Sequence, residues 1–67
     1  MVIYAFAIDY GLNGHEIISV HDEKIDPEME FRQWQANNAA RGLMQPYTTG
    51  YSLWRIDGDT GEIEELP

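Results

Sequence analysis

Residues 26–42, DPEMEFRQWQANNAARG, form the stretch that decides the fold, because they alone carry the signals of a helix. Asp26 can cap the free backbone N–H groups of the first turn, and Pro27 suits the first helical position. Arg41 and the Gly42 that follows it are typical of a helix end. We therefore expect one helix here, with strands and turns before and after it.

This predicted helix has two apolar stripes when its residues are placed at intervals of 100°. An aromatic stripe contains Phe31 and Trp34, with Asn38 on the same side. A stripe of small or flexible residues lies nearly opposite and consists of Met29, Ala36 and Ala40. The second stripe can be a solvent face rich in helix-favouring alanine, or it can contact a partner.

The segment before the helix predicts a β-hairpin. Residues 2–10 are rich in β-branched and aromatic types, which favours a strand. Because side chains alternate along a strand, Ala5 and Ala7 share one face, and the bulky residues share the other. We expect Phe31 and Trp34 to pack on the alanine face, where small side chains let a helix approach.

The hairpin turn sets the register of this strand with the next. Asn13-Gly14 is typical of a two-residue type I′ turn, so a second strand is expected over residues 15–21. That turn would pair Tyr10 with Ile17. The resulting aromatic face needs cover from residues 43–50 or from a second copy, which predicts a homodimer; the interface candidates are Tyr4, Phe6, Ile8, Tyr10 and Ile17.

Strand and turn signals return after the helix. Residues 43–50 form a loop, residues 51–56 a third strand, and residues 57–61 a turn rich in Asp and Gly. Residues 62–66 alternate acidic and apolar side chains, as expected of an edge strand. The predicted order is β-β-α-β-β: one α+β domain over residues 1–67, with an antiparallel sheet of about four strands packed against one helix.

Composition narrows the classes of partner. The 67 residues contain no cysteine and carry a formal charge of −8, from twelve acidic and four basic side chains. Nucleic-acid backbones and anionic membranes attract the opposite charge, so we expect neither as a direct partner. No signal peptide or membrane-spanning run is seen, and we expect a cytoplasmic protein.

The acidic residues fall into two groups. The first acidic group lies around the start of the helix and comprises Asp22, Glu23, Asp26, Glu28 and Glu30. The second acidic group lies near the end of the chain and comprises Asp57, Asp59, Glu62, Glu64 and Glu65. Between them, residues 31–55 contain no acid. Two such rows could imitate nucleic-acid phosphates and bind a basic protein groove, or they could only confer solubility.

Few residues suggest catalysis or metal binding. His15 and His21 are the only histidines, with no cysteine to complete a metal site. Asp57-x-Asp59-x-Gly61 departs from a calcium loop because its glycine comes one place early. We expect no enzyme activity, no catalytic residue, no metal and no cofactor. The acid-free middle offers an alternative, in which arginines and aromatic residues bind a nucleotide or a single strand; the residues are Arg32, Arg41, Arg55, Trp34, Tyr47, Tyr51 and Trp54.

Three segments in the second half carry a resemblance to a known family. They are Phe31 with Asn37-Asn38, residues 51–56 (YSLWRI) and residues 59–63 (DTGEI). This pattern resembles the C-terminal half of the small nonstructural proteins of microviruses, the small phages with single-stranded DNA. The resemblance covers roughly half of the chain, and residues 1–25 do not follow the family pattern. It implies a phage origin.

The leading hypothesis from the sequence is a small acidic phage-type protein that inhibits a basic host protein such as a nuclease, a CRISPR effector or a polymerase. Both acidic groups would make the contact. A structural or assembly protein that forms an oligomer through its apolar sheet face is the second hypothesis. A nucleotide or single-strand binder is the third.

Overall fold

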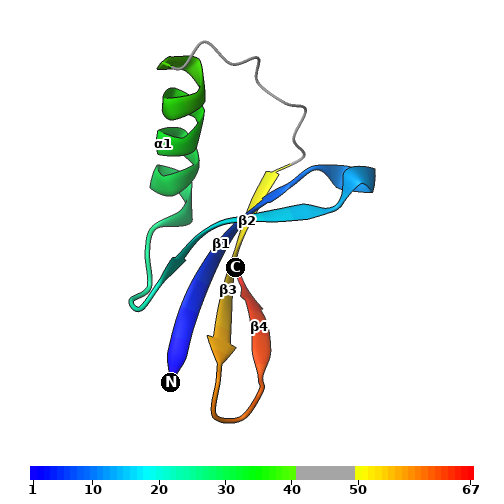
Figure 1. Ribbon diagram of the computed structural model, residues 1–67, viewed down its shortest axis with the longest axis vertical. Helices are drawn as coiled ribbons and strands as arrows, with labels where there is room; N and C mark the ends of the chain where they lie inside the picture. Colours follow the sequence, from blue (N-terminus) through cyan, green and yellow to red (C-terminus); the bar gives the residue numbers. More distant parts are fainter. Residues whose placement is uncertain (41–49) are drawn as a thin grey trace.

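The computed structural model describes residues 1–40 and 50–67. Four strands form one antiparallel sheet in the order β2-β1-β3-β4, and one helix packs against it (Figure 1). This arrangement confirms the predicted α+β class and the β-β-α-β-β order. The elements are β1 (Val2–Asp9), a short 3-10 turn (Gly11–Asn13), β2 (His15–His21), α1 (Pro27–Ala40), β3 (Gly50–Asp57) and β4 (Ile63–Leu66).

Helix α1 begins where the sequence predicts. The Asp26 side chain accepts a hydrogen bond from the backbone N–H of Glu28 at 3.1 Å, which satisfies one of the free donors of the first turn. One turn further along, Arg32 donates to Glu28 at 2.8 Å. The predicted end signals, Arg41 and Gly42, lie outside the described residues, as do residues 43–49 of the predicted loop.

The helix covers the aromatic face of the sheet, so the predicted packing on the alanine face is wrong. Phe6 and Ile8 are 0% exposed, and they form the core with Leu53. Phe31 and Trp34 pack against this core from the helix. The physical reason is area: covering Phe6 and Ile8 removes far more apolar surface from water than covering two alanines.

This packing also removes the reason for a dimer through the aromatic face. Phe6 and Ile8 are already buried, while Tyr4 and Tyr10 are partly buried against the same core. Ile17 does not lie on this face at all: its pairing partner is Ala7, on the opposite side of β1. The five predicted interface residues therefore do not form one exposed surface.

The misplaced Ile17 follows from the hairpin turn. The connection runs through a 3-10 turn, with positive φ at Gly11 (68°) and Gly14 (86°) and not at Asn13. The Tyr10 N–H donates to the Gly14 carbonyl at 2.8 Å and closes a longer loop, so the two-residue turn is wrong. The register then shifts between Phe6 and Ala7, where Ile18 is an extra residue that packs against the core.

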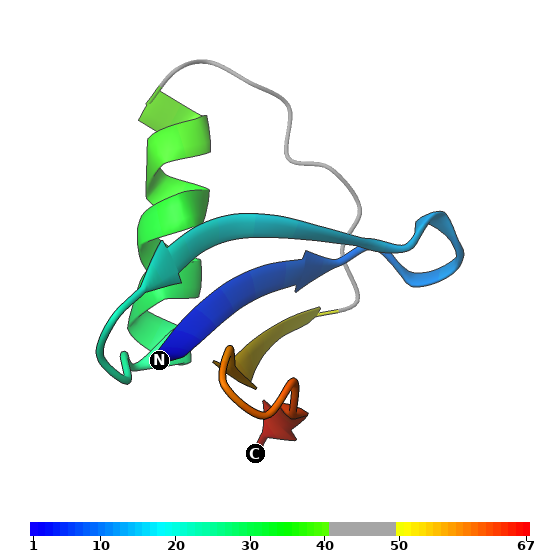
Figure 2. The same ribbon diagram turned by 60° about the horizontal axis from the view of Figure 1, so that its bottom comes forward.

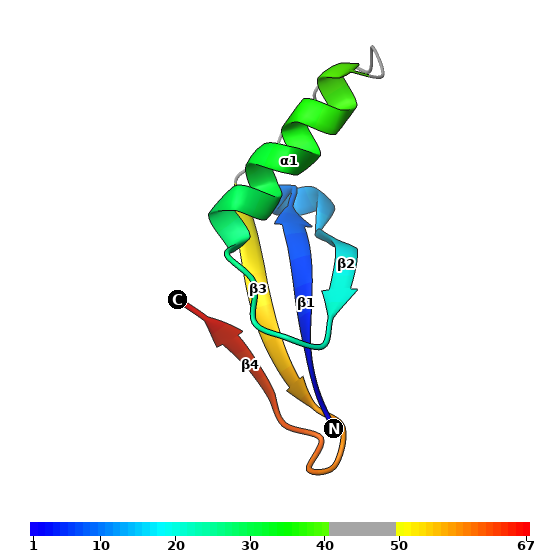
Figure 3. The same ribbon diagram turned by 90° about the vertical axis from the view of Figure 1, so that its left-hand side faces the viewer.

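The sheet and the helix make two layers. The helix lies on one side of the sheet (Figure 2), and the strands appear beside one another when viewed from the helix side (Figure 3). No described helix or strand packs on the other side. We call this side the open face; by register its apolar residues are Ile3, Ala5, Ala7, Ile17, Val20, Trp54, Ile56 and Ile63.

Candidate interaction surfaces

The topology brings parts of both acidic groups to the same end of the sheet. Strands β2 and β3 both run antiparallel to β1, so both finish where β1 begins. The turn from β2 to α1 begins beside Tyr4 and the turn from β3 to β4 begins beside Val2, so both lie toward this end, on either side of the N-terminus (Figure 1). We call it the acidic end; its acidic residues are Asp22, Glu23, Asp26, Asp57, Asp59 and Glu62.

Three of these six carboxylates form contacts within the protein. Asp26 caps α1, and Asp57 organises the β3–β4 turn. The carboxylate of Asp59 pairs with the amino group of Met1. These contacts stabilise the start of α1 and the β3–β4 turn.

The carboxylate of Asp57 accepts hydrogen bonds from the backbone of the β3–β4 turn. The backbone N–H of Asp59 donates to Asp57 Oδ1 at 2.9 Å, and that of Thr60 donates to the same atom at 3.4 Å. The hydrogen bond from Asp59 is the main reason why the pKa of the Asp57 carboxyl lies below its ordinary value. The ionised form therefore stabilises the turn.

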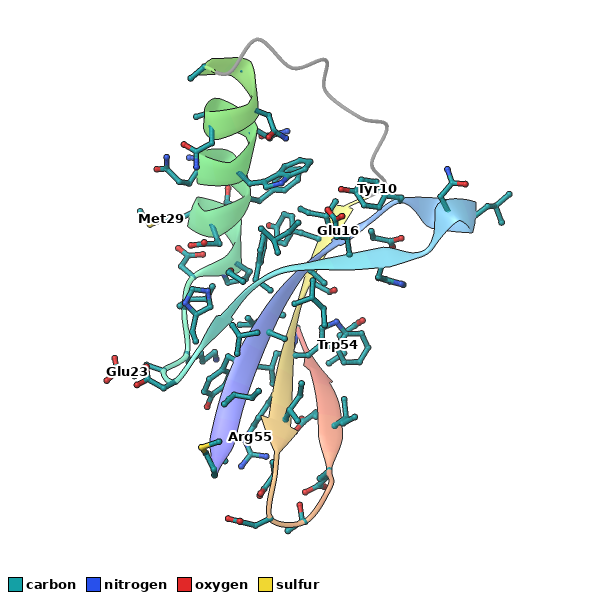
Figure 4. All side chains as sticks on the ribbon, in the orientation of Figure 1. Tyr10, Glu16, Glu23, Met29, Trp54 and Arg55 are labelled. Carbon is teal, nitrogen blue, oxygen red and sulfur yellow. The ribbon has the colours of Figure 1, made fainter. Side chains whose placement is uncertain are left out.

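The other three acids of this end are available to a partner. Asp22, Glu23 and Glu62 are exposed, and none of their carboxylates forms an ion pair within residues 1–40 and 50–67. Glu23 points away from the body of the protein (Figure 4). A partner can reach these side chains without breaking an internal ion pair.

The remaining predicted acidic residues are dispersed. Glu28 is paired with Arg32, and Glu30 is partly buried on the first turn of α1. On β4, Glu64 lies opposite Arg55 and Glu65 opposite Trp54, so these two acids point to different sides of the sheet. The structure thus gathers the turn acids and separates the β4 acids, where the sequence suggested two continuous rows.

The arginines and aromatic residues of the middle segment are not gathered into one surface. Trp34 and Tyr51 contact Phe31 on the core side, with ring centroids 6.0 and 4.8 Å away. Trp54 lies on the open face, where its indole N–H donates to Ser52 at 2.9 Å. Arg32 is on the exposed side of the helix, bound to Glu28. Arg41 and Tyr47 lie outside the described residues.

The opposite end of the sheet carries the β1–β2 hairpin, with Leu12 fully exposed at its turn. The Tyr10 hydroxyl donates to Glu16 at 3.1 Å (Figure 4). Desolvation, with a contribution from the Glu16 carboxylate, raises the pKa of Tyr10. His15 approaches Asp9 at 3.8 Å, at the margin of the open face.

Histidine and carboxylate side chains do not form a metal-binding group of three or more within the described part of the chain. No pocket is found among the residues that the structure describes. The described helix also lacks the length and apolar character needed to cross a membrane.

The sequence alone predicted neither the acidic end nor the open face with the residues that the structure places there. The acidic end depends on the antiparallel pairing of β3 with β1, which the β-β-α-β-β order leaves open. The residues of the open face could not be predicted correctly, because the Asn13-Gly14 signal gave the wrong register for the β1–β2 hairpin.

No family model matches the chain, and comparisons with curated proteins and with solved structures gave no match. The resemblance to microvirus proteins stays a prediction.

Proposed function

We propose that this protein binds a basic surface of another protein through its acidic end. The observation that supports the proposal is the convergence of the β2–α1 and β3–β4 turns, which puts six carboxylates at one end of the sheet. In sequence, Glu23 and Glu62 are far apart; in the fold, the turns that contain them share one end (Figure 1).

Grouped charges act together on an approaching partner. Exposed charges interact mainly within a Debye length, about 8 Å at physiological ionic strength, so the acids of each turn reinforce one another and a partner that spans both turns meets both sets. Their summed field raises the rate of encounter with a basic surface and favours one orientation. The described bases near this end are fewer: Lys24, Arg55 and the amino group of Met1, which Asp59 already pairs.

The basic partner we propose is a protein that binds nucleic acid, because such proteins carry the densest positive surfaces. The acidic end would occupy the surface that receives phosphates and would exclude the nucleic acid. The resemblance to microvirus proteins suggests a host nuclease, CRISPR effector or polymerase as the target. The protein then acts as an inhibitor by occupation, with no chemical step of its own.

A capture experiment with charge-matched variants tests this proposal. The immobilised protein is incubated with bacterial lysate, and bound protein is eluted with salt or with duplex DNA. One variant removes three charges from the acidic end (Asp22→Asn, Glu23→Gln and Glu62→Gln). The control removes three charges elsewhere (Glu16→Gln, Glu64→Gln and Glu65→Gln), so both variants have the same net charge.

We expect wild type and the control to capture a basic protein that duplex DNA displaces, and the acidic-end variant to lose it. Equal capture by the two variants would show that net charge alone matters and would contradict the proposal. A captured protein that DNA fails to displace would contradict the occupation of a nucleic-acid surface.

A role in assembly is the second candidate, and one observation favours it. Ile17, Val20 and Ile63 are 62%, 55% and 64% exposed on the open face. Large apolar side chains exposed on one face of a soluble protein often mark an interaction site.

A further inference from the structure

The accessible apolar surface of the open face is made by its larger side chains. Ala5 and Ala7 lie along the middle of this face and are only 2% exposed. On β2, Val20 and Ile17 lie beside these two alanines, and on β3 Trp54 lies beside Ala5. Ile17 and Val20 remain 62% and 55% exposed, so they offer apolar surface that contact with another molecule would remove from water.

The charges favour a second copy over a basic partner. By register, the described charged side chains of the open face are Asp9, His15 and Glu65, all at its margins. Two chains with a formal charge of −8 repel each other over most of their surface. The open face is where they can approach with the fewest acidic groups between them, and it offers a basic protein almost nothing to pair with.

The size of the open face fits one copy of itself. Strands β1 and β3 have 8 residues each, β2 has 7 and β4 has 4. At about 3.3 Å per residue and about 4.8 Å per strand, the four strands cover about 430 Å² in projection. A standard interface buries about 800 Å² of accessible surface per partner, so a contact over this face is small, as in weak and reversible complexes.

We infer that two copies of this protein pack open face to open face, as a weak and reversible homodimer. Two sheets with the same twist align at about −30° in such a sandwich, and a two-fold axis makes the contact identical on both copies. The aromatic face stays inside each copy and the acidic ends stay accessible. This inference does not depend on the proposed binding of a basic protein.

Sedimentation equilibrium from about 1 µM to about 1 mM tests the inference. The test variant is Ile17→Lys with Ile63→Lys, both on the open face. The control is Leu12→Lys with Met29→Lys, which are 108% and 67% exposed and lie elsewhere. Both variants add the same charge. Wild type and the control should approach twice 7.7 kDa at high concentration, and the test variant should stay at 7.7 kDa.

Salt provides a second readout, which also separates this dimer from the proposed binding at the acidic end. Added salt screens the repulsion between two acidic copies and should strengthen the dimer, whereas it should weaken binding to a basic protein. If the double variant is unfolded by circular dichroism, Val20→Lys takes its place. A monomer mass for wild type at every concentration, or a test variant that dimerises like the control, would overturn the inference.

Discussion

Replacement of Trp34 by alanine tests which face of the helix holds it on the sheet. Trp34 is partly buried against the core, and its ring stacks on Phe31 at a centroid distance of 6.0 Å. Truncation of a fully buried tryptophan costs about 3–5 kcal/mol, and Trp34 keeps a minor part of its surface exposed, so its truncation should cost about 2–3 kcal/mol. We expect Trp34→Ala to lower the free energy of unfolding by about 2–3 kcal/mol.

A loss of this size is large for a domain of 67 residues. The midpoint of thermal unfolding falls by about 4–8 °C per kcal/mol in a small domain, so Trp34→Ala should melt about 10–20 °C below wild type. Far-UV circular dichroism measures the transition without relying on the removed fluorophore.

Met29→Ala is the matched control on the same helix. Met29 is 67% exposed and points away from the sheet (Figure 4), so its truncation should change the free energy of unfolding by less than about 0.5 kcal/mol. Equal melting of the two variants would refute the docking of the helix by its aromatic stripe.

Three further predictions concern the helix cap and the β3–β4 turn. Asp26→Ala removes the cap on Glu28 and should cost about 1 kcal/mol, measured by urea unfolding. Gly61 has a φ of 76°, and no described atom lies within 4 Å of the position that a Cβ would take. Gly61→Ala should therefore cost about 1 kcal/mol through backbone strain alone, and a lower midpoint of thermal unfolding would show this loss. Because the pKa of Asp57 is lowered in the folded protein, its charge stabilises the fold above the ordinary value of 3.8, and that stability is lost as pH falls through the lowered pKa. Asp57→Asn should therefore melt below wild type at neutral pH and together with it at strongly acidic pH; a gap that persists in acid would contradict this role of the charge.

Local signals in the sequence predicted the elements well, because each depends on neighbouring residues. The Asp26-Pro27 start and the Glu28–Arg32 pair are both present in the structure. The third and fourth strands lie within one residue of the predicted bounds.

The face that the helix covers could not be predicted in the same way. It depends on a comparison between two sides of β1, and both sides are largely apolar. A preference for close approach over alanines favoured one side, whereas the burial of Phe6 and Ile8 favoured the other and prevailed.

The wrong register predicted for the β1–β2 hairpin assigned residues to the wrong face of the sheet. A strand shifted by one residue sends its side chains to the other face, so the turn decides where Ile17 points, and the bulge at Ile18 decides the register of the residues beyond it. The acidic end also required the order of the strands in the sheet, because β3 finishes at the start of β1 only as its antiparallel neighbour.

The affinity for the captured basic protein, measured at two ionic strengths with the two charge-matched variants, tests the proposed function most directly. Loss of the Asp22, Glu23 and Glu62 carboxylates should weaken binding at low salt and flatten its dependence on salt. Loss of the Glu16, Glu64 and Glu65 carboxylates should leave both nearly unchanged. Equal weakening by the two variants, or an affinity of wild type that does not respond to salt, would contradict recognition through the acidic end.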